Sequence, residues 1–112
     1  MYITKRVNLE NAATELKIMF DGYRPVTTDG DCEILTYYKV QNQDDSTPFS
    51  SKGWIQFDTT NVPDADSSRF RTYDYSVLNL DEFTGFAIKI VLKSKQTSRV
   101  PVIRQFRGLA LA

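Results

Sequence analysis

The chain contains no histidine, and this absence excludes more chemistry than any other feature of the composition. Nucleophilic schemes that pair a serine or cysteine with a histidine base have no base, and the most common zinc ligand is missing. The single cysteine, Cys32, cannot form an intrachain disulfide. It stands at the head of an apolar run, which favours a buried thiol. We therefore predict that the chain is not an enzyme and has no catalytic residues, bound metal or cofactor.

Glycine and long apolar segments are also scarce. The five glycines are scattered singly, so no glycine-rich loop is available to bind phosphate. No stretch approaches the roughly 18 apolar residues that a transmembrane helix needs. The opening Met-Tyr-Ile-Thr-Lys-Arg lacks the apolar centre of a signal peptide. We expect synthesis in the cytosol and no membrane partner.

Net charge is absent as well, because 14 basic residues balance 14 acidic ones. No overall field attracts the chain to nucleic acid, so we predict no nucleic-acid partner. The charge is segregated along the sequence, however. The last 24 residues hold six basic and no acidic residues, which leaves a net charge of −6 on the first 88. A nearly neutral chain favours association, as expected for a component of an oligomer or assembly.

Short runs in which apolar and polar residues alternate are the main structural feature of the sequence. Such runs, separated by turn-forming pairs such as Asp21-Gly22 and Val62-Pro63, indicate β-strands with one buried face. The 112 residues therefore predict one domain, 1–112, of the all-β class. We expect a single antiparallel β-sandwich, jelly-roll-like, with about seven to eight strands. The runs are Ile3–Leu9, Leu16–Phe20, Glu33–Gln41, Trp54–Asp58, Phe70–Val77, Phe86–Lys93 and Val102–Leu111.

The clearest run is Phe86–Lys93, in which Ile88 and Ile90 alternate with charged and small residues. This pattern predicts a central strand with both isoleucines buried. The first run predicts a continuous strand with Ile3, Lys5, Val7 and Leu9 on one face. Two short segments predict single helical turns, at Asn11–Glu15 and Asp81–Phe83.

Acidic residues cluster at three places, and each cluster lies in a predicted loop. Aspartate commonly stabilises turns, which is the interpretation that we favour. Two alternatives remain open, namely a calcium site at the edge of the sandwich and a pair of catalytic carboxylates. The clusters are Asp29/Asp31/Glu33, Asp44/Asp45 and Asp64/Asp66.

A basic stripe near the C-terminus is the first candidate interface. Lys89 and Lys93 share one strand face, and Lys95 and Arg99 lie in the turn that follows. Such a stripe can bind an acidic partner surface. The alternative is a solvated sheet face on which lysines oppose aggregation.

Trp54 is the second candidate. In the run Trp-Ile-Gln-Phe, Trp54 shares a face with Gln56, while Ile55 and Phe57 share the other. An exposed tryptophan on a sandwich face can stack on a sugar ring, so Trp54 is a candidate glycan-binding residue. The alternative, which we favour, is that Trp54 packs beneath the loop 42–53 that precedes it.

Several segments, taken in order, resemble a virion structural domain. The domain occurs in tail, baseplate and other virion structural proteins of contractile-tailed, T4-like phages and their cyanophage relatives. The resemblance covers most of the chain. The matching segments are Tyr2-Ile3-Thr4-Lys5-Arg6-Val7-x-Leu9, Gly22-Tyr23-Arg24-Pro25, Tyr37-Tyr38-Lys39-Val40, Asp44-Asp45-Ser46-x-Pro48-Phe49, Trp54, Phe83–Ile90, Val100-Pro101-x-Ile103 and Phe106–Leu111.

This resemblance implies a non-enzymatic component of a phage virion, assembled in the host cytoplasm and acting through contacts with other virion proteins. It implies no catalytic residue. Within such a domain we expect Trp54 to close the end of the sandwich, and Arg24 and Arg107 to hold loop carbonyls or carboxylates such as Asp21. The alternative function is a carbohydrate-binding sandwich that recognises a host-surface glycan.

Overall fold

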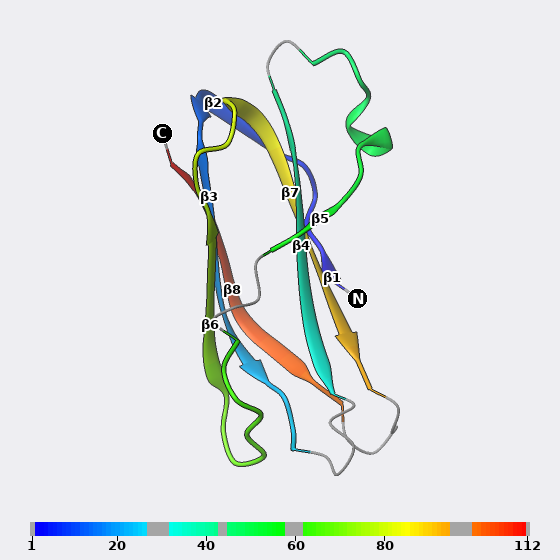
Figure 1. Ribbon diagram of the computed structural model, residues 1–112, viewed down its shortest axis with the longest axis vertical. Coiled ribbons are helices and arrows are strands. Elements are labelled where there is room, and N and C mark those ends of the chain that lie inside the picture. The colour runs from blue at the N-terminus through cyan, green and yellow to red at the C-terminus, as the bar shows by residue number, and fades with distance from the viewer. Residues whose placement is uncertain (1, 27–31, 43–44, 58–61, 95–99, 112) are drawn as a thin grey trace.

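Two antiparallel β-sheets packed face to face form the protein (Figure 1). The structure is a computed structural model that describes residues 2–26, 32–42, 45–57, 62–94 and 100–111. Sheet A contains β1 (Tyr2–Ile3), β2 (Val7–Ala13), β4 (Glu33–Gln41), β5 (Ile55–Gln56) and β7 (Phe83–Lys93). Sheet B contains β3 (Glu15–Tyr23), β6 (Arg71–Val77) and β8 (Val102–Leu111). A short 3-10 helix, η1 (Phe49–Ser51), lies in the loop between β4 and β5.

The central strand of sheet A is β7, which pairs with β4 on one edge and with both β1 and β2 on the other. In sheet B, β3 lies between β6 and β8. The chain crosses between the sheets at five of the seven connections between the described strands, whereas β1–β2 and β4–β5 stay within sheet A, so the strands wind in the jelly-roll-like manner that the sequence predicted. The all-β class and the antiparallel sandwich are therefore confirmed. The molecule measures 48 × 24 × 21 Å and is long in the strand direction.

The core is the layer of side chains between the sheets. Alternate residues of β3 and β7 point into it, and Ile88 and Ile90 are both 0% exposed. The predicted central strand is thus confirmed, because burial of these residues follows the period of two. Aromatic rings fill the wider part, where Phe20 stacks on Tyr73 with ring centroids 5.0 Å apart. Gly22 makes room for this stack, since a Cβ atom there would lie 2.6 Å from the Tyr73 ring.

One irregularity keeps β8 in the core. The register between β3 and β8 shifts between Met19 and Asp21, and Gln105 has a φ of 54°. This is a β-bulge, which places an extra residue on β8 and reverses the alternation of its faces. Because of the bulge, Ile103 and Phe106 both pack against the core although they are three residues apart.

The prediction of one continuous first strand is wrong, because the segment forms two strands, β1 and β2. The side chain of Thr4 interrupts the ladder: its Oγ1 accepts a hydrogen bond from Ile88 N at 2.9 Å, while Thr4 N donates to Ile88 O at 2.9 Å. The hydroxyl thus replaces a backbone acceptor, and residues 4–6 leave the strand. Lys5 and Val7 therefore do not continue one strand face from Ile3.

The two predicted helical turns are also wrong. Residues 11–13 belong to β2, and β3 begins at Glu15. At the corner between them, Thr14 N donates to Leu111 O at 2.9 Å and Thr14 O accepts from Leu80 N at 3.0 Å. Neighbouring strands therefore satisfy the backbone groups that a helical turn would have paired locally. Asp81 and Glu82 have no regular structure, and Phe83 is already the fully buried first residue of β7.

Cys32 is buried, at 3% exposed, as its apolar neighbours predicted. Among the residues that the structure describes, there is no helix with the length and apolar character needed to cross a membrane.

Candidate functional site: a cation–aromatic face on sheet A

The outer face of sheet A brings together side chains from β4 and β7. The strand register places Tyr37 opposite Lys89 and Lys39 opposite Ala87. These residues alternate with core residues, so their side chains point away from the core. The face is nevertheless closed to solvent at its centre, where Ala87 is 2% and Lys39 is 9% exposed.

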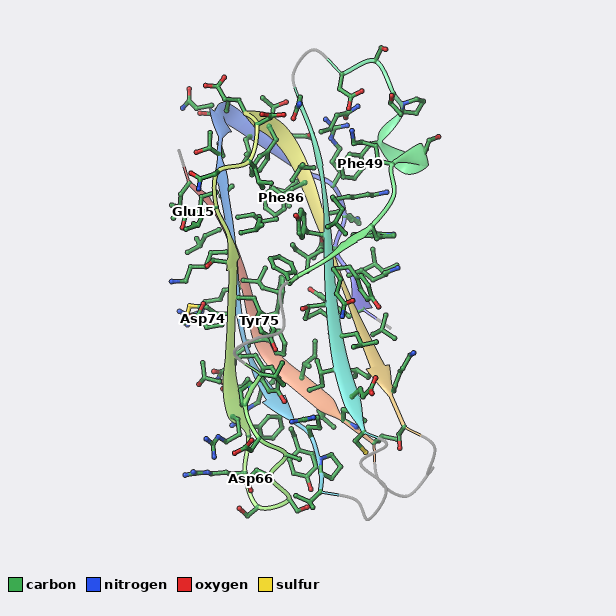
Figure 2. The ribbon with its side chains drawn as sticks, in the orientation of Figure 1. Glu15, Phe49, Asp66, Asp74, Tyr75 and Phe86 are labelled. Carbon is green, nitrogen blue, oxygen red and sulfur yellow. The ribbon has the colours of Figure 1, made fainter. Side chains whose placement is uncertain are left out.

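The cover is the loop that connects β4 to β5. Phe49 from η1 and Trp54 just before β5 lie over the strands, and Figure 2 shows Phe49 on the side of β4 that faces away from sheet B. The ammonium group of Lys39 donates a hydrogen bond to Phe49 O at 3.0 Å. It also lies 4.6 Å from the centroid of the Phe49 ring and 4.8 Å from that of Trp54. A buried lysine is thereby stabilised by one carbonyl and two aromatic rings.

Lys89 joins the same cluster. Its ammonium nitrogen lies 4.8 Å from the Tyr37 ring centroid and 5.0 Å from that of Trp54. Two candidates that the sequence offered for different functions, the basic stripe and the tryptophan, therefore meet in one place. Trp54 is partly buried on the outer face of sheet A, where its ring contacts Lys39 and Lys89, and it does not close the end of the sandwich.

Arg6 completes the cluster from the segment between β1 and β2. Its guanidinium carbon lies 4.9 Å from the centroid of the Phe49 ring. Its Nη1 donates to the side chain of Gln41, and its Nε donates to Asn8 Oδ1 at 2.8 Å. Gly85 permits this path, because a Cβ atom there would lie 2.7 Å from the guanidinium. We call the whole set the cation–aromatic face: Arg6, Tyr37, Lys39, Phe49, Trp54 and Lys89.

Polar contacts hold the covering loop in place. Gln41 Nε2 donates to Thr47 O at 2.6 Å, and Asp45 Oδ1 accepts from Thr47 N at 2.9 Å. The other carboxylate oxygen of Asp45 pairs with Lys52. The hydrogen bond from Lys52, followed by that from Thr47, lowers the pKa of Asp45 below its ordinary value. Asp45 thus acts as a turn-forming residue, as favoured for its cluster.

Asp66 has a similar role at the other end of the molecule. Its Oδ1 accepts from Ser68 N at 2.8 Å and from Ser68 Oγ at 2.6 Å, and Arg69 Nε contacts Oδ2 at 3.1 Å. These contacts, those from Ser68 first, lower the pKa of Asp66 strongly. Asp29, Asp31 and Asp44 lie outside the described residues. Within the described ranges, no three or more His, Cys, Asp or Glu side chains are grouped so that they could hold a metal ion.

Of the remaining predicted interface residues, only Lys93 lies within the described part of the chain. Lys93 is exposed at the end of β7, where the register places it opposite Glu33. Lys95 and Arg99 lie outside the described residues. The basic C-terminal segment meets the acidic remainder at one contact, where Arg104 of β8 lies 3.7 Å from Asp21 of β3. Arg24 holds a loop carbonyl as expected, because its Nη2 donates to Pro63 O at 2.6 Å, whereas the ion pair of Asp21 is made by Arg104.

Four members of the cation–aromatic face were not identified as site residues from the sequence: Arg6, Tyr37, Lys39 and Phe49. Lys39 had a visible indication, because it lies two residues from Tyr37 on the outward side of a predicted strand. Phe49 had none, since its position depends on how the covering loop folds.

The arrangement suits binding better than bond-making chemistry. Aromatic rings fix the positions of three cations, so their side-chain entropy is already reduced before any partner arrives. Trp, Tyr and Arg are also the side chains enriched at protein interfaces. Comparison with known proteins adds no family or relative, because no family model, curated protein or solved structure matches the chain.

Proposed function

We propose that the protein is a non-enzymatic structural module of a phage virion that binds a neighbouring virion protein through the cation–aromatic face. The single observation that carries the binding role is the cluster of Lys39, Lys89 and Arg6 on aromatic rings. The virion setting is supported by the ordered sequence resemblance to tail and baseplate-type domains.

The charge of the face favours an acidic partner. Lys89 contacts only aromatic rings among the described residues, and Lys93 at the end of the same strand is exposed. An acidic surface that docks here supplies carboxylates to cations that the rings have already positioned, which fixes the register of docking. Charged pairs at the rim accelerate association, whereas the buried Lys39 holds the loop in its binding shape.

The test is incorporation into particles of the phage that encodes the chain. We expect quantitative mass spectrometry of purified particles to find the protein in a fixed ratio to the other virion proteins. Lys89→Glu, and separately Lys93→Glu combined with Lys95→Glu, should leave a β-type circular dichroism spectrum unchanged and reduce incorporation at least tenfold. Lys17→Glu is the matched control, because Lys17 is a strand lysine on the outer face of sheet B.

The outcomes separate the parts of this proposal. Absence of the protein from purified particles would rule out the virion role. Normal incorporation of all the charge-reversed variants would rule out the cation–aromatic face as the interface. Equal losses in the variants and in Lys17→Glu would indicate a general effect of charge and contradict the specific site.

A glycan-binding module is the second candidate, because Trp54 and Tyr37 lie near one another around Lys89. The same observation weighs against it, since the ammonium groups of Lys39 and Lys89 occupy positions over the Trp54 ring that a stacked sugar would need. A glycan array probed with the purified protein distinguishes the two. Binding that is lost in Trp54→Ala and retained in Lys93→Glu would favour the glycan function over ours.

A further inference from the structure

A second site lies apart from the cation–aromatic face, at the open edge of the sandwich between β4 and β6. A pocket of about 220 Å³ is lined there by Arg24, Glu33, Gln56 and Tyr73, with apolar neighbours. Arg24 reaches it just after the end of β3, and Tyr73 reaches it from β6 across the core. The pocket therefore connects solvent with the interior of the sandwich.

The protein contains buried side-chain polar atoms without hydrogen-bond partners, and two of them belong to residues that line this pocket, Arg24 and Tyr73. Among the described residues the unpaired atoms are Arg24 Nε, Thr36 Oγ1, Tyr73 Oη and Tyr75 Oη. Three of these residues are deeply buried, with Thr36 and Tyr73 each 1% exposed and Tyr75 4% exposed, whereas Arg24 is partly buried. Most buried polar atoms in proteins have partners, and each unpaired one is destabilising. The two that belong to the pocket lining, Arg24 Nε and Tyr73 Oη, therefore need an explanation.

Three of these residues, Arg24, Tyr73 and Tyr75, influence one another. Tyr73 and Tyr75 are neighbours on the inner face of β6, with ring centroids 6.2 Å apart, and Figure 2 shows Tyr75 pointing between the sheets. Burial, and then the neighbouring Tyr73, raise the pKa of Tyr75 to about 12, while Arg24 acts in the opposite direction. Thr36 lies on the inner face of β4, two residues after Ile34, which also lines the pocket.

We propose that this pocket binds a small oxyanion, a carboxylate or a phosphate, which accepts hydrogen bonds from Arg24 Nε and from the Tyr73 hydroxyl. Arg24 is already fixed for this role, because its Nη2 donates to Pro63 O at 2.6 Å and leaves Nε directed elsewhere. A guanidinium and hydroxyl donors together suit an anion better than a cation or a neutral ligand. The volume is below the roughly 300 Å³ of typical small-molecule sites, so the bound group is small.

Glu33 lies at the solvent-exposed side of the pocket and restricts which anions can bind there. It is exposed, and its carboxylate opposes extended polyanions while leaving a single compact anion tolerable near Arg24. The oxyanion can be a free ion or the side chain of an acidic residue in a partner. The experiment below separates these sources.

The test is a nuclear magnetic resonance titration of the uniformly ¹⁵N-labelled full chain at constant ionic strength, with sodium chloride as the reference salt. The probes are sodium acetate, sodium phosphate and N-acetyl-aspartyl amide. We expect saturable shifts of the Arg24 Nε–H resonance and of the amides of Gln56 and Tyr73, with dissociation constants in the millimolar range. A response to acetate or phosphate alone indicates a free ion, whereas a stronger response to the aspartyl probe indicates an acidic side chain.

Two variants make the test decisive. Tyr73→Phe removes only an unpaired hydroxyl, so it should fold at least as well as the parent and weaken binding about tenfold. Arg24→Gln should abolish saturable shifts. The matched controls are Tyr2→Phe and Arg69→Gln, which keep the pocket and should bind as the parent does.

No saturable shift with any of the three probes would overturn the proposal, and water would then be the only occupant of the pocket. Equal affinities in the parent and in Tyr73→Phe would overturn it too, because the hydroxyl would then make no contact with the anion. Both results are independent of virion incorporation, so failure here is distinguishable from failure of the proposed function.

Discussion

The outer faces of the two sheets differ in how they are covered. On sheet A, the loop between β4 and β5 closes over the strands, so that Lys39 is 9% exposed and Ala87 is 2% exposed. On sheet B, Lys17 pairs loosely with Asp74 at 3.9 Å, and Leu109 of β8 is 51% exposed. Figure 2 shows Asp74 directed away from the sandwich, with no second layer beyond it.

This difference bears on the stability of each sheet and on our proposal for its function. Sheet A is buried on both sides at the centre of β7, whereas sheet B is buried on one side only. A lysine at the covered centre of sheet A is therefore a structural residue, whereas a lysine on the outer face of sheet B is solvated. The cations of sheet A are therefore held in place at a cost in desolvation, which is the reason that we assign binding to this face.

The largest expected effect is on the layer that the two sheets share. Ile90→Ala should lower the free energy of unfolding by about 2–5 kcal/mol, because it leaves a cavity in a fully buried site. Leu109→Ala on the open face of sheet B should lower it by less than about 1 kcal/mol. Urea unfolding of both variants checks this. A loss of less than about 1 kcal/mol for Ile90→Ala would contradict the assigned faces of β7.

The second prediction compares two lysines on the outer faces. Lys39→Met keeps most of the aliphatic packing but removes the ammonium group from Phe49 and Trp54. Two cation–aromatic contacts and one hydrogen bond are lost, so we expect a loss of about 1–3 kcal/mol. Lys17→Met removes a half-exposed ion pair and should change stability by less than about 1 kcal/mol. If urea unfolding showed equal losses of stability in Lys39→Met and Lys17→Met, the two outer faces would not differ in the way that we describe.

Much of this architecture could be predicted from the sequence, and the exceptions have physical causes. The period-two pattern of β7 identified the buried Ile88 and Ile90, because burial on one face is recorded in the alternation itself. The division between β1 and β2 was not predictable, since it depends on a hydrogen bond from Ile88 to the Thr4 side chain, 84 residues away. Residues 11–13 were assigned a helical turn because their local preferences do not reveal pairing with β7.

Only two residues of the candidate site were predicted from the sequence, and they were predicted separately. Lys89 and Trp54 were both identified, but as parts of rival functions. Their meeting depends on two tertiary features, the pairing of Tyr37 with Lys89 and the path of the covering loop. Lys39 was missed because a charged residue within a strand is normally expected to face solvent. Its burial results from the loop between β4 and β5, which places Phe49 and Trp54 over it.

The third prediction measures the coupling between Lys89 and Trp54. A double-mutant cycle with Lys89→Met and Trp54→Phe should give an interaction free energy of about 0.5–1 kcal/mol, the range for a partly exposed cation–aromatic pair. The reference cycle joins Lys17→Met with Trp54→Phe, two sites on opposite faces, and should be additive. Additivity in the first cycle as well would indicate that the contact makes no energetic contribution to the cation–aromatic face.

The smallest expected effect concerns the pH dependence of the loop that covers sheet A. The hydrogen bonds from Lys52 and Thr47 lower the pKa of Asp45 in the folded protein. A depressed folded-state pKa means that the contribution of Asp45 is fully present above its ordinary, unfolded-state pKa and is lost as the pH falls through the folded value. Carboxyl-detected nuclear magnetic resonance should therefore find a titration midpoint for Asp45 below the ordinary aspartate value of about 3.9. As Asp45 protonates, the resonances of Phe49 and Trp54 should move with the same midpoint, because this carboxylate anchors the loop that carries them.

Asp45→Asn should remove that transition and leave the resonances of the open face of sheet B unchanged. If the rings of the loop showed no response to the titration of Asp45, its ion pair with Lys52 would not control the cover, and the closed face of sheet A would depend on the cation–aromatic contacts alone.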